Sequence, residues 1–245
     1  MAAATKQRLL AVLIDADNVS AKHAEAIFEE IAAFGEASVR RIYGDFSGGA
    51  IQGWTKDKLA EHAIIPRQQF ANTTKKNASD IALVIDAMDL LHTGRFNGFV
   101  LISSDSDFTS LASRVREQGM DAIGMGLQKT PVSFRNACNR FIYLENLEND
   151  EKAPKISPDK KNVTAPATKK KLPSPKKLIE TAMDAIDQED DWYLIQQVHE
   201  KLRSARPDFD PRSYGHKKMV SLVDHLNGFE TKRNQNNQPI MRKTG

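Results

Sequence analysis

Two short stretches of this chain are almost entirely apolar, and they restrict its fold more than any other feature. Residues 9–14 are Leu-Leu-Ala-Val-Leu-Ile, and residues 98–103 are Gly-Phe-Val-Leu-Ile-Ser. A run of this length without polar alternation is typical of a strand that is buried on both faces. Such strands occur in parallel sheets that helices cover on both sides. The sequence therefore predicts an α/β domain.

Strand and helix patterns alternate through residues 8–147, the predicted N-terminal domain. Further strands are predicted at residues 39–43, 64–68, 122–125 and 141–144. Helices are predicted at residues 21–34, 52–60, 80–91, 108–118 and 131–138. Ser20 and Ser79 are expected to cap the first and third of these helices, and Gly119 to close the fourth. This order implies a mostly parallel sheet flanked by helices.

A segment rich in lysine and proline divides the chain. Between residues 148 and 177 there are nine lysines, five prolines and no aromatic residue. Such a segment cannot bury enough apolar surface to offset its ordering entropy, so residues 148–175 are predicted to be a disordered linker. Its lysines can attract a phosphate backbone or simply keep the linker soluble. Residues 176–245 then form a second predicted domain.

Composition excludes several classes of protein. No apolar run approaches the roughly 18 residues that span a bilayer, and the first ten residues lack the pattern of a secretory signal. The single cysteine, Cys138, excludes an intramolecular disulfide and a cysteine-based metal site. We therefore expect a reducing, cytoplasmic setting and no membrane partner.

Aspartates follow two of the predicted strands. Asp15 and Asp17 come directly after residues 9–14, and Asp105 and Asp107 come after residues 98–103. In open parallel sheets, sites form outside the carboxyl ends of the strands, so these carboxylates meet if the two strands are neighbours. Asp80, in the first turn of a predicted helix, adds another carboxylate.

Carboxylates gathered in one cleft repel one another, and a divalent cation relieves the repulsion. Oxygen ligands favour Mg²⁺ or Mn²⁺, and no cluster rich in histidine or cysteine points to zinc. A metal held in this way suits phosphodiester hydrolysis, because it activates a water molecule. Taken singly, each aspartate can equally be a helix cap or a turn residue.

Three motifs stand out in this domain, and they are Ile14-Asp15-Ala16-Asp17-Asn18, Lys76-Asn77-Ala78-Ser79-Asp80-Ile81-Ala82-Leu83 and Ser103-Ser104-Asp105-Ser106-Asp107-Phe108. They resemble the motifs of the NYN family, also called LabA-like, within the PIN-like nuclease superfamily. The resemblance covers nearly all of residues 9–147. One departure is Ser104, which stands where many members have glycine.

The resemblance implies a metal-dependent ribonuclease that uses Mg²⁺ or Mn²⁺. Its catalytic, metal-binding carboxylates would be Asp15, Asp80, Asp105 and Asp107, with Asn18 positioning a ligand or phosphate. Lys75, Lys76 and Ser104 are predicted to contact RNA, although solvation of the lysines and packing of the serine are alternatives. Weaker candidates for contacts to RNA are Arg40, Arg41, Arg67, Arg135, Trp54 and Phe70.

The C-terminal part follows a winged-helix plan. Helices are predicted at residues 176–186 and 195–204, and a third begins at Asp210-Pro211 and ends at Gly228. Strands at residues 229–232 and 239–242 would form a hairpin.

This C-terminal part resembles the OST-HTH or LOTUS domain, and the resemblance is carried by Asp191-Trp192, the stretch from Pro207 to Met219, and Gly228-Phe229-Glu230. The resemblance implies RNA binding or docking of a protein partner. Arg212, Lys217 and Lys218, on the predicted third helix, are candidate phosphate contacts or simply solvent-facing residues.

Three functions remain open on the sequence alone. The first is an RNA endonuclease with a tethered recognition module. The second is a catalytically inactive RNA-binding adaptor with the same fold. The third is a phosphohydrolase of the haloacid-dehalogenase type, because Asp15-Ala16-Asp17 also satisfies the first motif of those enzymes.

Overall fold

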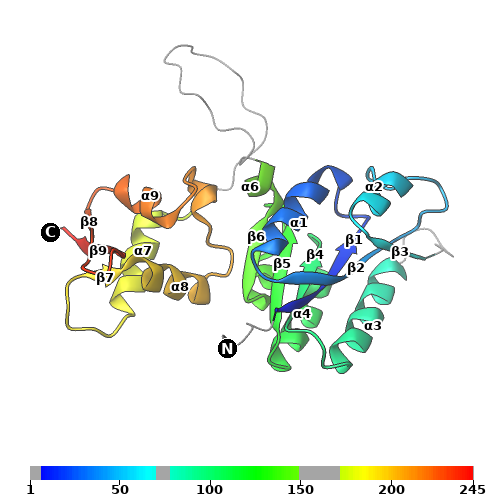
Figure 1. The fold of residues 1–245 in the computed structure, drawn as a ribbon, viewed down its shortest axis with the longest axis horizontal. Coiled ribbons are helices and arrows are strands. Elements are labelled where there is room, and N and C mark those ends of the chain that lie inside the picture. Colours follow the sequence, from blue (N-terminus) through cyan, green and yellow to red (C-terminus); the bar gives the residue numbers. More distant parts are fainter. Residues whose placement is uncertain (1–6, 70–77, 149–171, 245) are drawn as a thin grey trace, which may run out of the picture. The chain divides into compact units, whose positions relative to one another are not determined.

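The structure, a computed structural model, describes residues 7–69, 78–148 and 172–244. The chain divides into two compact units, Met1–Glu148 and Asn149–Gly245, and each is described by itself (Figure 1). Lys75, Lys76 and most of the predicted linker lie outside the described residues.

The N-terminal unit is built on a six-stranded sheet. Its strands are β1 (Leu9–Asp15), β2 (Glu36–Gly44), β3 (Ile65–Gln68), β4 (Gly98–Ile102), β5 (Asp121–Gly126) and β6 (Arg140–Tyr143). The order across the sheet is β3-β2-β1-β4-β5-β6, and each neighbouring pair runs parallel. The predicted α/β class with a mostly parallel sheet is confirmed.

Helices cover both faces of this sheet (Figure 1). On one face lie α1 (Ala24–Ala32), α2 (Lys56–Glu61) and α6 (Leu144–Glu148), which contribute to one apolar core. On the other lie α3 (Ala78–His92), α4 (Thr109–Glu117) and α5 (Val132–Ala137), which contribute to a second core. Alternate residues of β1 enter different cores, Leu10 and Val12 the first and Ala11 and Leu13 the second. The unbroken apolar run of β1 is therefore required by burial on both faces.

The helix predicted at residues 52–60 begins later than expected. The backbone at Gln52 and Gly53 has positive φ angles of 49° and 84°, which no helix contains. The helix α2 begins at Lys56, after Thr55, whose side chain accepts a hydrogen bond from the Lys58 amide at 3.2 Å. The N-cap is thus Thr55, and the turn before it belongs to a loop.

The two predicted serine caps have different outcomes. Ser20 does cap a helical turn, the 3-10 helix η1 (Ala21–His23) that precedes α1, by accepting a hydrogen bond from the Lys22 amide. The prediction that Ser79 caps a helix starting at Asp80 is wrong, because Ser79 lies within α3, which includes Ala78. Its hydroxyl donates instead to the Asp17 carboxylate at 3.0 Å.

The C-terminal unit contains helices and a small antiparallel sheet. The helical elements are α7 (Pro175–Asp184), α8 (Ile195–Ala205), the 3-10 helix η3 (Pro211–Tyr214) and α9 (Met219–Asp224). The strands β7 (Tyr193–Leu194), β8 (Phe229–Arg233) and β9 (Pro239–Lys243) are arranged in the order β7-β9-β8. Among the described residues, no helix has both the length and the apolar character needed to cross a membrane.

The prediction of one continuous third helix after Asp210 is wrong. Asp210 does begin a helical turn, because its side chain accepts a hydrogen bond from the Arg212 amide at 2.8 Å. This turn is η3, and it ends at Gly215, whose left-handed φ of 84° a helix does not accommodate. A separate helix, α9, begins only at Met219. The strand β7 was not predicted, because its two residues are defined only by pairing with β9.

Gly126, at the end of β5, connects the fold to the edge of the sheet where the aspartates lie. A Cβ atom there would come within 2.4 Å of the Ser103 carbonyl oxygen and 2.8 Å of the Thr130 hydroxyl oxygen. We expect Gly126→Ala to lower the free energy of unfolding by about 1–3 kcal/mol, measured by denaturant titration. The matched control is Gly48→Ala, because its Cβ would meet nothing within 4 Å. Equal stability of the two variants would contradict this prediction.

Candidate metal centre

The aspartates after β1 and β4 share one edge of the sheet because these strands are direct neighbours. In their register Ile14 pairs with Ile102, so Asp15 and Ser103 follow at the same level. In the sheet, β2 and β3 lie on one side of β1, and β4, β5 and β6 lie on its other side. In open α/β sheets a crevice forms where the strand order reverses in this way.

Asp15 is held inside the protein by three hydrogen bonds. Only 1% of the residue is exposed. Its carboxylate accepts from the Ser103 hydroxyl at 2.7 Å, from the Asn18 amide nitrogen at 2.8 Å and from the Asp17 backbone at 3.1 Å. Burial raises the pKa of Asp15, and the hydrogen bonds from Ser103 and Asn18 oppose that rise. Asp15 is therefore a fixed, desolvated carboxyl at the base of the crevice.

Three other carboxylates converge above it. Asp80, Asp105 and Asp107 each place an oxygen within 4.8 Å of the others. Asp105 is the N-cap of the 3-10 helix η2 (Ser106–Phe108), and its side chain accepts a hydrogen bond from the Asp107 amide at 2.9 Å. This turn after β4 therefore orients both aspartates at once. Asp80 and Asp105 are partly buried, whereas Asp107 is exposed.

Asp80 comes from a different part of the chain. It lies in the first turn of α3, next to Ser79, whose hydrogen bond to Asp17 ties the start of this helix to the loop after β1. Desolvation raises the pKa of Asp80 to about 6, and the charges of Asp15, Asp105, Asp107 and Asp17 add to the effect. Desolvation and the neighbouring charges together thus oppose ionisation of Asp80 at mildly acidic pH.

This set of oxygens fits a divalent cation. Carboxylates are the ligands that Mg²⁺ and Mn²⁺ prefer, and three of them lie close enough to bind one ion. A bound cation would also remove the repulsion that raises the pKa of Asp80. The four predicted carboxylates therefore form two groups. Asp15 is buried and hydrogen-bonded, whereas Asp80, Asp105 and Asp107 lie together and are more exposed.

Other predicted site residues are engaged within the protein. The amide of Asn18 donates to Asp15. Ser104 is only 8% exposed, and its hydroxyl accepts from the Leu127 backbone at 2.9 Å. Trp54 is 1% exposed and donates to the Val19 carbonyl, which fits packing rather than stacking on a base. Lys75, Lys76 and Phe70 lie outside the described residues.

The basic residues predicted to lie on one helix of the C-terminal unit lie elsewhere. Arg212 is in η3, where its guanidinium bonds both oxygens of Asp210 at 2.8–3.2 Å. Lys217 and Lys218 precede α9 and are exposed. The placement of all three on a third helix is wrong, because Gly215 interrupts it.

Sequence reasoning gave too little weight to Ser103. Its hydroxyl donates to Asp15 and also accepts from the Asp105 backbone amide at 3.1 Å, so it joins the two strand ends. A polar residue ending an apolar strand directly before two aspartates was the available signal. The contact between Ser79 and Asp17 had no such signal, because it depends on where α3 begins.

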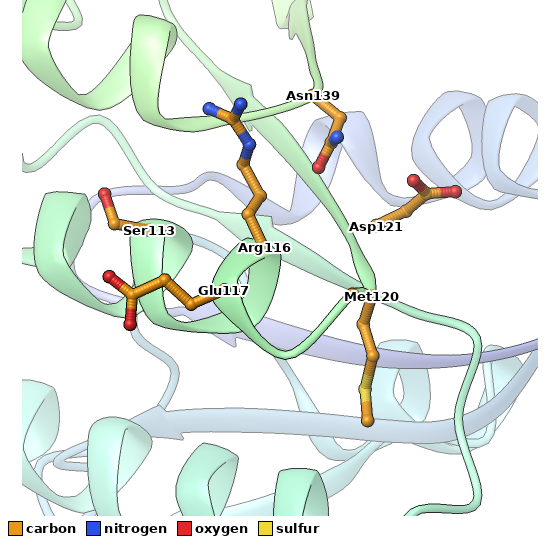
Figure 2. A pocket seen from close by; sticks show the side chains of 7 residues that line it. Ser113, Arg116, Glu117, Met120, Asp121 and Asn139 are labelled. Atoms are coloured by element: carbon orange, nitrogen blue, oxygen red, sulfur yellow. The ribbon is translucent and has the colours of Figure 1, made fainter.

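The opposite, amino edge of the sheet also contains a hollow, of about 500 Å³. It lies at the start of β5, and Figure 2 shows side chains that line it, among them Ser113, Arg116, Glu117, Met120, Asp121 and Asn139. Arg116 donates to the carbonyl oxygens of residues 136 and 137. The acidic cluster is at the other end of the strands, so this hollow is separate from it.

The parallel sheet and the acidic edge define a PIN-like α/β domain, a fold of nuclease type. The NYN domain family matches residues 9–145, and the chain belongs to this family. The OST-HTH/LOTUS domain family matches residues 168–241, in the order expected from the sequence.

The chain is also similar to solved structures. A protein of unknown function, VPA0982 from Vibrio parahaemolyticus RIMD 2210633, is 16% identical with a TM-score of 0.44. The match covers 58% of this chain and 95% of that chain. A search of proteins with curated descriptions found no match.

Ser103 is expected to stabilise the site as well as the fold. Ser103→Ala removes a donor from the buried Asp15 carboxylate and should lower the free energy of unfolding by about 1–3 kcal/mol. Ser103→Thr keeps the hydroxyl and should recover most of the loss. Thermal unfolding of both variants beside Ser110→Ala, an exposed serine on α4, checks this. An unchanged midpoint for Ser103→Ala would show that the hydrogen bond contributes nothing.

Asp80 should make the metal-free protein less stable as the pH rises. Its carboxyl binds a proton more tightly in the folded state, where the pKa is about 6, than at its ordinary value of 3.8. The resulting stabilisation is present below pH 4 and is lost as the pH rises to about 6. In EDTA at pH 7.5, Asp80→Asn should therefore raise the free energy of unfolding by about 1 kcal/mol, after allowance for solvent screening.

Denaturant titrations of wild type and Asp80→Asn at pH 4, 5, 6 and 7.5 measure this difference. The gain from the substitution should shrink toward zero at pH 4. Added Mn²⁺ should stabilise the wild type more than the variant. A gain that does not depend on pH would mean that charge repulsion is not its cause.

Proposed function

We propose that the N-terminal domain is a divalent-metal-dependent ribonuclease that cuts single-stranded RNA internally. The observation that carries the proposal is the convergence of Asp80, Asp105 and Asp107 within 4.8 Å at the carboxyl edge of an NYN domain. Membership of this family supports nuclease chemistry, and the OST-HTH/LOTUS domain supports RNA as the substrate.

The residues of the site divide the work between them. Asp80, Asp105 and Asp107 would hold Mg²⁺ or Mn²⁺, which when bound polarises the scissile phosphate and lowers the pKa of a water molecule. Asp15 would add a further negative charge near the ion, and its carboxylate is kept in one orientation by hydrogen bonds from Ser103 and Asn18. Asp107 is the exposed member and would lie nearest to the RNA strand.

The C-terminal domain would hold RNA or a protein partner near the site. A tether between the two domains raises the local concentration of whatever the second domain binds. Lys217 and Lys218 are exposed and remain proposed phosphate contacts, as do Lys75 and Lys76, which precede Asp80 in the sequence. The ion pair of Arg212 with Asp210 makes Arg212 a weaker contact, because its charge is already balanced.

The two alternative functions are less well supported. A haloacid-dehalogenase-type enzyme needs an accessible nucleophile, whereas Asp15 is 1% exposed and accepts three hydrogen bonds. An inactive adaptor has no need for three carboxylates gathered within 4.8 Å of one another. Calorimetric titration with Mn²⁺ separates the adaptor from the nuclease, because the nuclease must bind the ion.

The test of the proposal is cleavage of RNA by the full chain. Wild type should cut a labelled single-stranded RNA in Mg²⁺ or Mn²⁺ and not in EDTA. Asp105→Asn should lower the rate by at least about a hundredfold, because it removes a ligand charge from the ion. Gel analysis of products from an RNA blocked at both ends checks that the cut is internal.

The matched control is Asp57→Asn, an exposed aspartate in the first turn of α2. Its activity should equal that of the wild type. Failure of folded wild-type protein to cut RNA or DNA with either ion would overturn the assignment as a nuclease. Binding of Mn²⁺ without any cleavage would favour the adaptor.

A further inference from the structure

A second cavity lies beside the acidic cluster, between α3 and the edge strand β3. It has a volume of about 390 Å³ and is lined by Tyr43, Arg67, Gln69, Ala82, Ile85, Asp86 and Asp89. These residues come from β2, the end of β3 and the exposed side of α3. We call this cavity the α3–β3 groove.

The register of the sheet explains why β3 forms one wall of the groove. Ile65 pairs with Arg41 and Arg67 with Tyr43, and Tyr43 belongs to the core beneath α3. Ile65 and Arg67 are two residues apart on one strand, so they project toward the same face as Tyr43. Among the described residues β3 pairs with β2 alone, so this wall lies at the outer edge of the sheet.

Both elements that form the groove carry exposed isoleucines. Ile81 and Ile85, four residues apart on α3, are 60% and 58% exposed, and Ile65 on β3 is 57% exposed. Ile81 and Ile85 are one helical turn apart, so they share one exposed side of α3, and Ile85 also lines the groove. The sequence of α3 explains the exposure, because apolar residues occupy more of the helix than its buried side requires.

The polar groups of the groove differ in how far they are exposed and bonded within the protein. Asp86 is bonded by Arg41 and by the Tyr43 hydroxyl, so its charge is balanced inside the protein. Arg67 forms an ion pair with Asp86 through Nε at 3.6 Å, but its side chain is 45% exposed, so its remaining N–H groups can also donate to a ligand. Asp89 is exposed and has no hydrogen-bond or ion-pair partner among the described residues.

The chemistry of the lining selects a class of ligand. Because Arg41 already balances Asp86, the charges of Arg67 and Asp89 cancel, and the groove has no excess positive charge to select a phosphate. An apolar wall with a donor and an acceptor at its edge suits a flat heterocycle. Guanine fits best, because its O6 and N7 accept from arginine and its amino group donates to a carboxylate.

We propose that the α3–β3 groove binds an unpaired guanine of the RNA strand, close to the phosphate held at the acidic cluster. Asp80 and Ile85 are on one helix, five residues apart, which is about 7.5 Å along its axis. That is roughly two base steps of 3.4 Å, so the groove would receive a base within about two nucleotides of the cut. The position near the cut depends on the proposed nuclease function, whereas binding of the base does not.

The test is photo-crosslinking of the full chain in EDTA, which needs no cleavage. The probes are 8-nucleotide single-stranded RNAs carrying one 6-thioguanosine or, at the same position, one 4-thiouridine. We expect 6-thioguanosine to crosslink, by peptide mapping, within residues 65–69 or 81–89. Ile85→Ser should lower this yield at least fivefold, and Val132→Ser, another exposed apolar residue on α5, should not change it.

A second measurement addresses the choice of base. Asp89→Asn removes the charged acceptor and should lower the preference for guanosine over adenosine about tenfold, in crosslinking or in cleavage. Glu117→Gln, a carboxylate at the other edge of the sheet, is its control. If the wild type cuts no RNA but still crosslinks at the groove, the proposed nuclease function is rejected and the proposed guanine site is not.

Three results would overturn the groove as a site for guanine. The first is crosslinking to other peptides only. The second is equal yield for the two thio-bases in wild type and in both groove variants. The third is a fall from dimer to monomer in light scattering of Ile85→Ser with no change in crosslinking, which would assign the exposed isoleucines to contact between two copies of the chain.

Discussion

The parallel pairing of β1 with β4 is the constraint on which the rest of the N-terminal domain depends. It places Ile14 opposite Ile102, so the polar residues that follow these two strands lie side by side although they are 88 residues apart in the sequence. Moving either strand by one residue would exchange its two faces and bury the wrong side chains. The apolar run that fixes the register by burial therefore also fixes the position of the carboxylates.

Desolvation and repulsion act differently on the members of the acidic group. Asp15 is surrounded by donors, so its burial is compensated, and Ser103 connects it to the backbone of Asp105. The Asp80 side chain accepts no hydrogen bond among the described residues, so desolvation, together with the charges of four other carboxylates, raises its pKa to about 6. A charge that the protein itself leaves uncompensated is one that a divalent cation would balance, because such an ion serves several carboxylates at once.

The sequence predicts the sheet and its acidic edge well, because both depend on local patterns. Fully apolar runs reveal buried strands, and aspartates directly after them reveal the edge at which they lie. The errors occur where backbone conformation or distant contacts decide the outcome. Gly215 was not recognised as a helix terminator within a long apolar pattern. Ser79 has the residue type of a cap, but its hydroxyl bonds a side chain 62 positions away.

Residues of the α3–β3 groove were beyond the reach of sequence patterns for the same reason. Arg67 and Asp89 have no common motif, and they meet only because β3 pairs with β2 at the edge while α3 crosses the same face. The first turn of α3 carries Asp80 to the acidic cluster, and the next two turns form the wall of the groove. A rigid helix keeps these two parts at a constant separation. The atom at which the strand is cut and a base near it would therefore be positioned by a single element.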